Sequence, residues 1–178
     1  MKRLLAAEAL FEYGVEALSR RALTASELRT RLERRAARIQ DVDEVLKRLG
    51  AVGYLDDSRV AESYSRFRKE CEALGPKRIV RELQRRGVDS SLAEAAVGEA
   101  YEGSDEMELI HAHLRKKLGK EYRERKIEDP KVIVRLYRGL ARAGFAGDRI
   151  VDALREISSD SEWLVGFADD PGDESWEV

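Results

Sequence analysis

Apolar residues recur along the chain at the three- and four-residue spacing that places side chains on one face of a helix. The first stripe consists of Leu4, Ala7, Phe11, Val15 and Leu18. This stripe predicts a helix over residues 2–20. Thr24 followed three residues later by Glu27 is a capping-box pattern, which predicts the start of a second helix. A third helix is predicted from Asp41 to Gly50.

The same succession recurs in the middle of the chain. Asp56 and Asp57 are placed to cap a helix there, because side-chain carboxylates accept hydrogen bonds from the first free backbone amides. The apolar stripe of that helix consists of Val60, Tyr64, Phe67, Cys71 and Leu74. Because Cys71 continues this stripe, we expect its thiol to be buried in the core. Gly75-Pro76 ends the helix and begins the next, and a short alanine-rich helix follows.

A third succession completes the pattern. A helix is predicted to begin at Ser104 or Asp105, and a charged connector covers residues 119–128. Further helices are predicted to open at Asp129 and at Asp148. No segment alternates apolar and polar residues in the manner of a strand, so the sequence predicts an all-α protein.

Superposing Leu32, Leu83 and Leu140 reveals an internal repeat with a period of about 50 residues. The aligned segments are "ELRTRLERRA", "RIVRELQRRG" and "VIVRLYRGLARAG". The repeat predicts three tandem three-helix units that bury each other's remaining apolar faces in an elongated, curved array. The predicted divisions are residues 1–55, 56–103 and 104–157, followed by an acidic tail over residues 158–178.

Charge is distributed unevenly among the 33 basic and 35 acidic residues. Residues 158–178 contain 7 acidic residues and no Lys or Arg, so the rest of the chain carries an excess of positive charge, and 24 of its basic residues are arginine. This pattern indicates a polyanionic partner or a protein bound to one, and a merely solvated surface is the alternative. We expect the tail to be disordered, or to compete with DNA for the arginines.

Several functional classes find no support in the sequence. No apolar run approaches the about 20 residues that a membrane span needs, and we expect a cytoplasmic protein. The lone Cys71 excludes an intrachain disulfide, and His111 and His113 do not share a helix face as metal ligands would. Phosphate-binding glycine loops and nucleophile–base pairs are absent, so we expect no cofactor, no metal and no catalytic residues.

Three segments of the chain resemble the RecX family of bacterial recombinase regulators. They are "GYLDDSRVAESYSRFR" (Gly53–Arg68), "LGPKRIVRELQRRGV" (Leu74–Val88) and "LARAGFAGDRIVDAL" (Leu140–Leu154). The resemblance runs from about Ala17 to Ile157 and implies a tandem three-helix-repeat protein. It also implies a protein that is not an enzyme, and that binds the RecA recombinase filament on single-stranded DNA within its helical groove and opposes its activity.

The match to this family has two departures. Val60 stands where the family usually has an aromatic residue, so we expect a smaller core contact there. Ala36 stands where the other two repeats have Gly87 and Gly144, so we expect the end of that helix to be shifted.

Arginines recur in one register on the middle helix of each predicted unit. Relative to the aligned leucines, the middle helices carry Arg34, Arg78, Arg81, Arg85, Arg135, Arg138 and Arg142. Guanidinium groups bind phosphates and carboxylates in a two-pronged geometry that lysine cannot match. We therefore predict that these residues contact the recombinase or DNA. The alternative is a solubilising surface in which Glu82 pairs with Arg78.

A second basic cluster follows the first helix of the third unit. Its candidate binding residues are Lys116, Lys117, Lys120 and Arg123. Tyr122 lies among them, and basic residues with an interleaved aromatic ring can bind single strands through phosphate contacts and stacking. A charged connector with no binding role is the alternative.

The sequence and the resemblance together favour a non-enzymatic regulator that binds the RecA filament and inhibits its ATPase, strand-exchange and coprotease activities. Single-stranded DNA is a second candidate partner, and we expect a monomer. The first alternative is a helix-turn-helix-like DNA-binding protein, because three-helix units with basic helices can enter a major groove. A helical scaffold for another protein is the second alternative.

Overall fold

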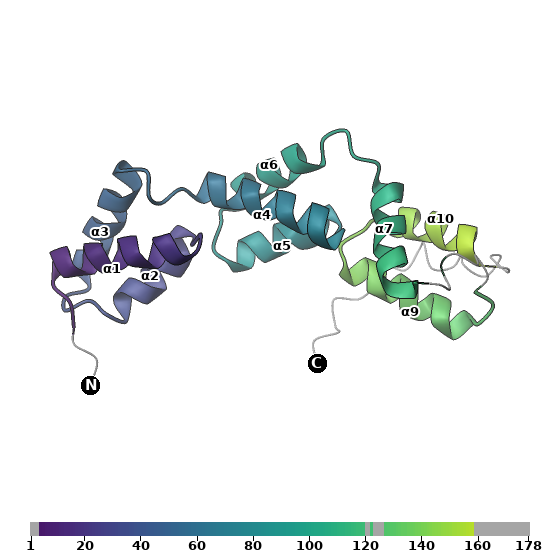
Figure 1. The fold of residues 1–178 in the computed structure, drawn as a ribbon, viewed down its shortest axis with the longest axis horizontal. Helices are drawn as coiled ribbons and strands as arrows, with labels where there is room; N and C mark the ends of the chain where they lie inside the picture. The colour runs from purple at the N-terminus through teal and green to yellow at the C-terminus, as the bar shows by residue number, and fades with distance from the viewer. Residues whose placement is uncertain (1–3, 120–121, 123–126, 159–178) are drawn as a thin grey trace. The chain divides into compact units, whose positions relative to one another are not determined.

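The computed structural model describes residues 4–119, 122 and 127–158 of the chain (Figure 1). Within these ranges the secondary structure consists of helices and isolated bridges with no strand, which confirms the all-α prediction. The helices are α1 (Ala7–Arg20), α2 (Ala25–Glu33), α3 (Gln40–Ala51), α4 (Asp57–Glu72), α5 (Pro76–Arg85), α6 (Ser90–Tyr101), α7 (Glu106–Leu118), α9 (Pro130–Arg142) and α10 (Gly147–Ile157). The predicted acidic tail beyond Ser158 lies outside the described residues.

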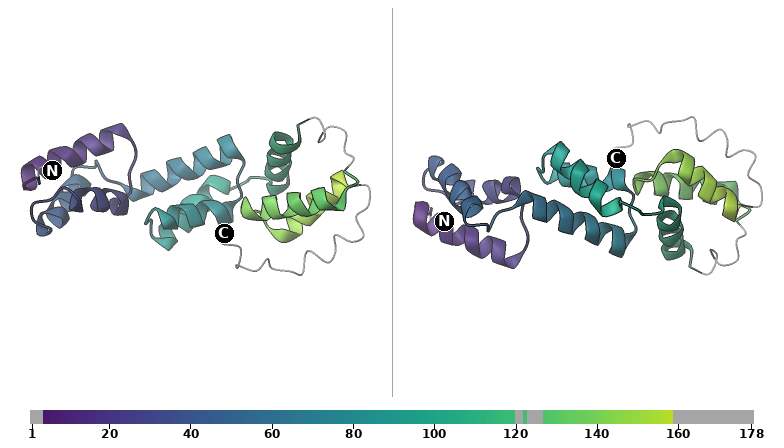
Figure 2. Two further views of the ribbon diagram at one scale, coloured as in Figure 1. Left: turned by 90° about the horizontal axis from the view of Figure 1, so that it is seen from below. Right: turned by 90° about the horizontal axis from the view of Figure 1, so that it is seen from above.

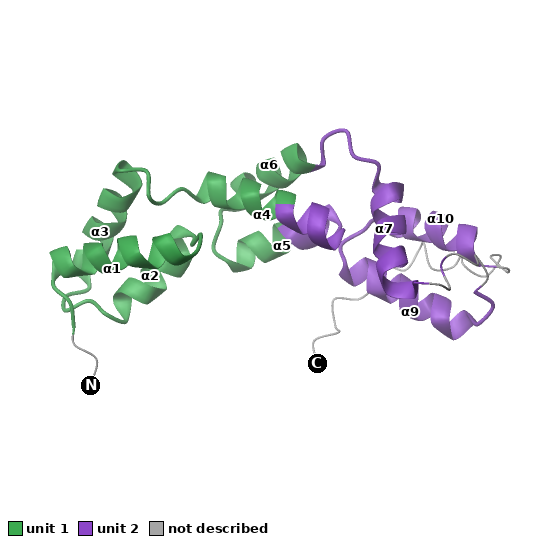
Figure 3. Cartoon of the chain, viewed as in Figure 1, with its two compact units in different colours: residues 1–66, 80–100 green, residues 67–79, 101–178 purple. Residues whose placement is uncertain are grey.

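The chain divides into two compact units (Figure 3). The first comprises residues 1–66 and 80–100, and the second comprises residues 67–79 and 101–178. The division passes through α4 and α5, so each unit contains one outer group of helices and part of the middle group. The boundaries predicted from the repeat stay a prediction.

Helices α1, α2 and α3 pack together as a first group (Figures 1 and 2). They enclose their own apolar core. Leu10, Leu28 and Leu49 are fully buried there, one from each helix. The predicted capping box is confirmed, because the Thr24 hydroxyl accepts a hydrogen bond from the amide of Glu27 at 3.1 Å and the Glu27 carboxylate accepts one from the amide of Thr24 at 3.1 Å.

The predicted start of the first helix was wrong. Among the described residues, α1 begins at Ala7, and Leu4 is 59% exposed. Leu5, two residues before α1, instead pairs with the segment that follows α2. Its amide donates to the carbonyl of Arg35 at 2.7 Å, and its carbonyl accepts from the amide of Ala37 at 2.8 Å. These bonds hold the backbone extended before α1, so Leu4 is not part of the helix although its spacing from Ala7 fits one.

The predicted apolar stripe of α4 is confirmed at Val60 and Leu74, which are buried, and was wrong at Phe67 and Cys71. The buried residues of α4 are Val60, Ala61 and Ser65, whereas Phe67 is 56% exposed and the thiol-bearing residue Cys71 is exposed. Each residue of a helix advances by about 100°, so Phe67 points about 200° away from Ser65. Val60 and the small residues Ala61 and Ser65 therefore form the packed face of α4, and Phe67 and Cys71 lie off it.

The third group of helices is arranged around α10, which packs against both α7 and α9. Ile110, Ile133 and Ile150 are buried, one from each helix. The predicted caps at the first two helices are confirmed, since Asp105 accepts from the amide of Met107 and Asp129 accepts from the amide of Lys131. No helix in the described part of the chain is long and apolar enough to cross a bilayer.

Candidate partner-binding surface

The middle helices of the three groups, α2, α5 and α9, present arginines on the side opposite their buried leucines. Arg34, Arg85 and Arg142 each lie two residues after an aligned leucine that is buried, and all three are exposed. Arg81 and Arg138 each lie two residues before such a leucine and are also exposed. Two residues turn a helix by about 200°, so burial of the leucine forces each of these guanidinium groups towards solvent.

Arg78 is placed differently from the rest of the predicted set. It is half-buried, and its Nη1 donates a hydrogen bond to the carbonyl of Arg142 at 3.3 Å. Its guanidinium group therefore provides a hydrogen-bond donor for a free carbonyl at the C-terminal end of α9. Arg135 is exposed on α9, five residues before Leu140.

The second basic cluster is only partly described. Lys116 and Lys117 are exposed, and Nζ of Lys116 donates to the carbonyl of Cys71 at 2.6 Å, which satisfies a free carbonyl at the end of α4. Tyr122 contacts Nδ1 of His111 through its hydroxyl at 2.6 Å. Lys120 and Arg123 lie outside the described residues, so their role stays a prediction.

The two adjacent aspartates act as helix caps. Asp56 accepts a hydrogen bond from the amide of Arg59 at 3.0 Å, at the start of its own helix. Asp57 accepts one from the amide of Ala25 at 2.8 Å, at the start of α2. Capping was therefore the right interpretation, and Asp57 additionally connects two helix groups.

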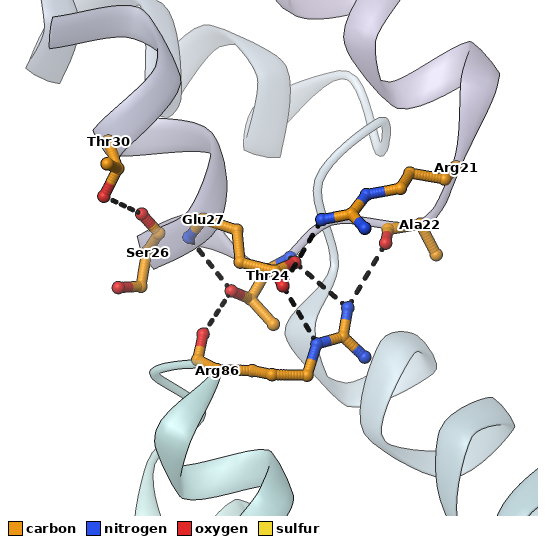
Figure 4. A network of polar contacts seen from close by, with 7 residues as sticks. All are labelled: Arg21, Ala22, Thr24, Ser26, Glu27, Thr30 and Arg86. Atoms are coloured by element: carbon orange, nitrogen blue, oxygen red, sulfur yellow. Dashed lines mark hydrogen bonds and ion pairs between the residues drawn. The ribbon is translucent and has the colours of Figure 1, made fainter.

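A polar joint connects α2 to the C-terminal end of α5 within the first unit (Figure 4). The hydroxyl of Thr24, the N-cap residue of α2, donates to the carbonyl of Arg86 at 2.6 Å. The guanidinium group of Arg86 in turn donates from Nε and Nη2 to the two carboxylate oxygens of Glu27, at 3.1 and 3.0 Å. Such a two-pronged pair fixes orientation as well as distance.

The ionisation of this pair follows from its geometry. Burial, the largest single effect, raises the pKa of Glu27, but the hydrogen bonds from Arg86 and the amide of Thr24, together with the positive charges of Arg86 and Arg21, leave the pKa below its usual value. The hydrogen bond to Glu27 raises the pKa of Arg86, against the opposing effect of burial. Both groups are therefore charged at neutral pH.

A second joint connects the start of α5 to the end of α9 within the second unit. The amide of Gly75, which precedes α5, donates to the carbonyl of Ala143 at 2.7 Å. A Cβ placed on Gly144 would lie 2.4 Å from the backbone nitrogen of Arg78, closer than side-chain atoms come to backbone. Gly144 also has a φ of +93°, which favours glycine.

The two joints use the same relationship between successive middle helices. In each, the residue that precedes a middle helix donates a hydrogen bond to the carbonyl just before the helix-ending glycine of the next group. A Cβ on Gly87 would lie 2.3 Å from the Cβ of Ser26, so this glycine is required for the close approach just as Gly144 is.

The departure at Ala36 follows from these joints. The residues around Ala36 pair with the extended backbone at Leu5, whereas those around Gly87 and Gly144 meet the start of another middle helix. The helix α2 ends one residue after Leu32 and α5 ends two residues after Leu83, a difference no larger than ordinary fraying of helix ends, so the expected shift stays a prediction.

Sequence reasoning missed Arg86 as a residue of interest. Arg86 lies next to Arg85 but does not occupy a position that the three repeats share. The sequence assigned Glu27 only its local role in the capping box. The single signal in the sequence was a capping-box glutamate, which does not reveal a partner 59 residues away. No group of three or more possible metal ligands occurs among the described residues.

These features define a class of tandem three-helix proteins with exposed arginines in register on their middle helices. Comparison with known proteins identifies the family. The family model described as "RecX, second three-helix domain" matches residues 56–97. A regulatory protein RecX from Deinococcus radiodurans is 36% identical over 151 residues, which cover 85% of this chain and 69% of that protein. The chain belongs to the RecX family of regulatory proteins.

Other relatives agree with this assignment. A regulatory protein RecX from Halorhodospira halophila is 32% identical over 162 residues, which cover 88% of this chain and 93% of that protein. One from Bacillus licheniformis is 28% identical, and the match spans 56% of its length. The crystal structure of RecX from Lactobacillus salivarius has the same fold, with a TM-score of 0.70 at 22% identity over 85% of this chain and 96% of that one.

Proposed function

We propose that this protein binds the RecA recombinase filament on single-stranded DNA and inhibits its ATPase, strand-exchange and coprotease activities. It acts in the cytoplasm as a monomer and by binding alone, without catalysing a reaction. The family assignment supports a regulatory role, and the partner follows from the family that the sequence resembles.

The observation that carries this proposal is the shared register of exposed arginines at the C-cap of α2 and on α5 and α9. A solubilising surface needs positive charge but does not need it at the same helical positions in each group. Arg34, Arg85 and Arg142 instead repeat one position, where burial of the preceding leucine holds the guanidinium group outward. Such groups suit the phosphates and carboxylates of a nucleoprotein filament.

The proposal is tested by ATP hydrolysis of preformed RecA filaments on single-stranded DNA, titrated with this protein. The wild-type protein should inhibit hydrolysis. The triple variant Arg85→Ala, Arg135→Ala, Arg142→Ala should require at least about tenfold more protein, because each lost charge-assisted contact is worth roughly 1 kcal/mol. Arg78 is left in place, because its contact with Arg142 contributes to the second joint.

A matched control removes the same number of exposed positive charges elsewhere. The variant Lys47→Ala, Arg66→Ala, Arg149→Ala changes α3, α4 and α10 and leaves the middle helices intact. It should inhibit almost as well as the wild type, and both variants should keep the wild-type circular dichroism. No inhibition by the folded wild-type protein, combined with sequence-selective binding to duplex DNA, would favour the helix-turn-helix-like alternative.

A further inference from the structure

The first joint is held mainly by charged and polar groups. The buried core of the first helix group is formed by residues of α1, α2, α3 and the loop before α2, all between residues 10 and 49. The partly buried residues packed on this core extend no further than Leu55. The apolar core therefore ends at the joint, and polar contacts carry much of the connection between α2 and the end of α5. Small polar interfaces between helix groups allow relative motion unless specific contacts restrict it.

Arg86 makes most of these contacts. Besides its two bonds to Glu27, its Nη2 donates to the carbonyl of Ala22 at 3.3 Å, and its own carbonyl accepts from Thr24. The side chains of Arg86 and Glu27 are 21% and 22% exposed, so water competes with their pairing much less than at an open surface.

Both partners are oriented before they meet. The capping box holds the carboxylate of Glu27 against the start of α2. The guanidinium group of Arg86 lies over the ring of Tyr64, with its Cζ 5.0 Å from the ring centroid, and the Tyr64 hydroxyl donates to Glu82 at 2.9 Å. Because each side chain is already restrained by its own helix group, pairing costs little additional side-chain entropy.

We propose that Arg86 and Glu27 are a positioning pair, an ionic latch that holds α2 against the end of α5. The latch fixes the spacing between Arg34 and Arg85, the outward arginines that follow the two aligned leucines. A partner that contacts both arginines then meets them at a distance that is already fixed. Binding therefore does not have to restrict the relative motion of the two helices. The latch is a property of the free protein, and its effect on binding rests on the proposed function.

The latch is tested first without any partner. In a Cys71→Ser background, Lys47→Cys on α3 and Glu94→Cys on α6 carry spin labels at two exposed positions of the first unit. Pulsed electron paramagnetic resonance then measures the distribution of distances between them. Arg86→Gln and Glu27→Gln should each broaden this distribution. Glutamine at position 27 still suits a capping box, so α2 keeps its start.

The matched control is Arg85→Gln, which removes the neighbouring positive charge. It should leave the distance distribution unchanged and weaken binding to the filament. Arg86→Gln should both broaden the distribution and weaken binding, by about fivefold. The double variant of Arg86 and Glu27 should behave no worse than either single one, because both substitutions break the same pair.

Distance distributions identical to that of the wild type in both latch variants would overturn the proposal. A broadened distribution with undiminished filament binding would overturn the positioning role. If the wild-type protein does not bind the filament, the proposed function fails, and the distance distributions still decide whether the latch exists.

Discussion

The backbone nitrogen of Arg78 faces Gly144 so closely that any side chain at position 144 would collide with it, at 2.4 Å from the new Cβ. Gly75 lies in the same joint, where a Cβ would be 2.3 Å from the carbonyl carbon of Gly144. Two glycines, one before α5 and one after α9, therefore allow the backbones of successive helix groups to meet.

The first prediction separates steric conflict from backbone strain. Gly53 has a φ of +75° with no atom within 4 Å of a Cβ, so Gly53→Ala should cost only the left-handed conformation, about 1 kcal/mol. Gly144→Ala combines strain with a backbone collision and should lower the free energy of unfolding by roughly 3 kcal/mol. Urea unfolding followed by circular dichroism measures both, and equal losses would show that the joint tolerates a side chain.

The second prediction concerns the thiol of Cys71. Because α4 packs through Ala61 and Ser65 and leaves Cys71 exposed, a thiol reagent such as 5,5′-dithiobis(2-nitrobenzoate) should modify Cys71 in the native protein. The reaction should proceed without denaturant and at a rate comparable to that in the unfolded chain. Modification that occurs only after addition of urea would contradict the exposed position of Cys71 and support the buried one that the sequence pattern predicted.

The third prediction compares two large apolar residues of the middle helix group. Leu83 is fully buried, so Leu83→Ala should lower the free energy of unfolding by about 3 kcal/mol through lost burial and a cavity. Phe67 is 56% exposed, so Phe67→Ala should cost less than about 1 kcal/mol. Urea unfolding of both variants tests this order, and a larger loss for Phe67→Ala would contradict the orientation of α4.

The fourth prediction is a pH dependence carried by His113. Its Nδ1 donates to the carbonyl of Ala73 at 3.2 Å, and its Nε2 is buried with no hydrogen-bond partner in the described structure. Burial, assisted by the charge of Lys117, lowers the pKa of His113 below its usual value of 6.5. The unfolded chain therefore takes up a proton more readily than the folded one.

The sign of the effect follows from this difference. As the pH falls below about 6.5, protonation favours the unfolded chain and the free energy of unfolding decreases. His113→Gln, which keeps a donor for the carbonyl of Ala73, should be less stable at pH 7.5 but lose less on acidification to pH 5.5. Parallel pH profiles for the two proteins would assign the pH dependence to other groups.

Much of the fold was predictable because helices are governed by local spacing and local caps. The caps at Thr24, Asp56, Asp105 and Asp129 are confirmed, and the leucines that align the repeats are buried. The outward register of the arginines follows from the same periodicity, since a residue two positions from a buried leucine has to face away from the core.

What the sequence by itself determined, then, is the helical content, the repeat and the exposed face of each middle helix. Only the tertiary structure decided that α4 packs through Ala61 and Ser65, that Arg86 pairs with Glu27, and that Arg78 contacts the end of α9. These relationships depend on how closely backbones far apart in the chain approach one another. That distance is set by small residues such as Gly144 where the backbones meet. The spacing of apolar residues along a helix does not predict it.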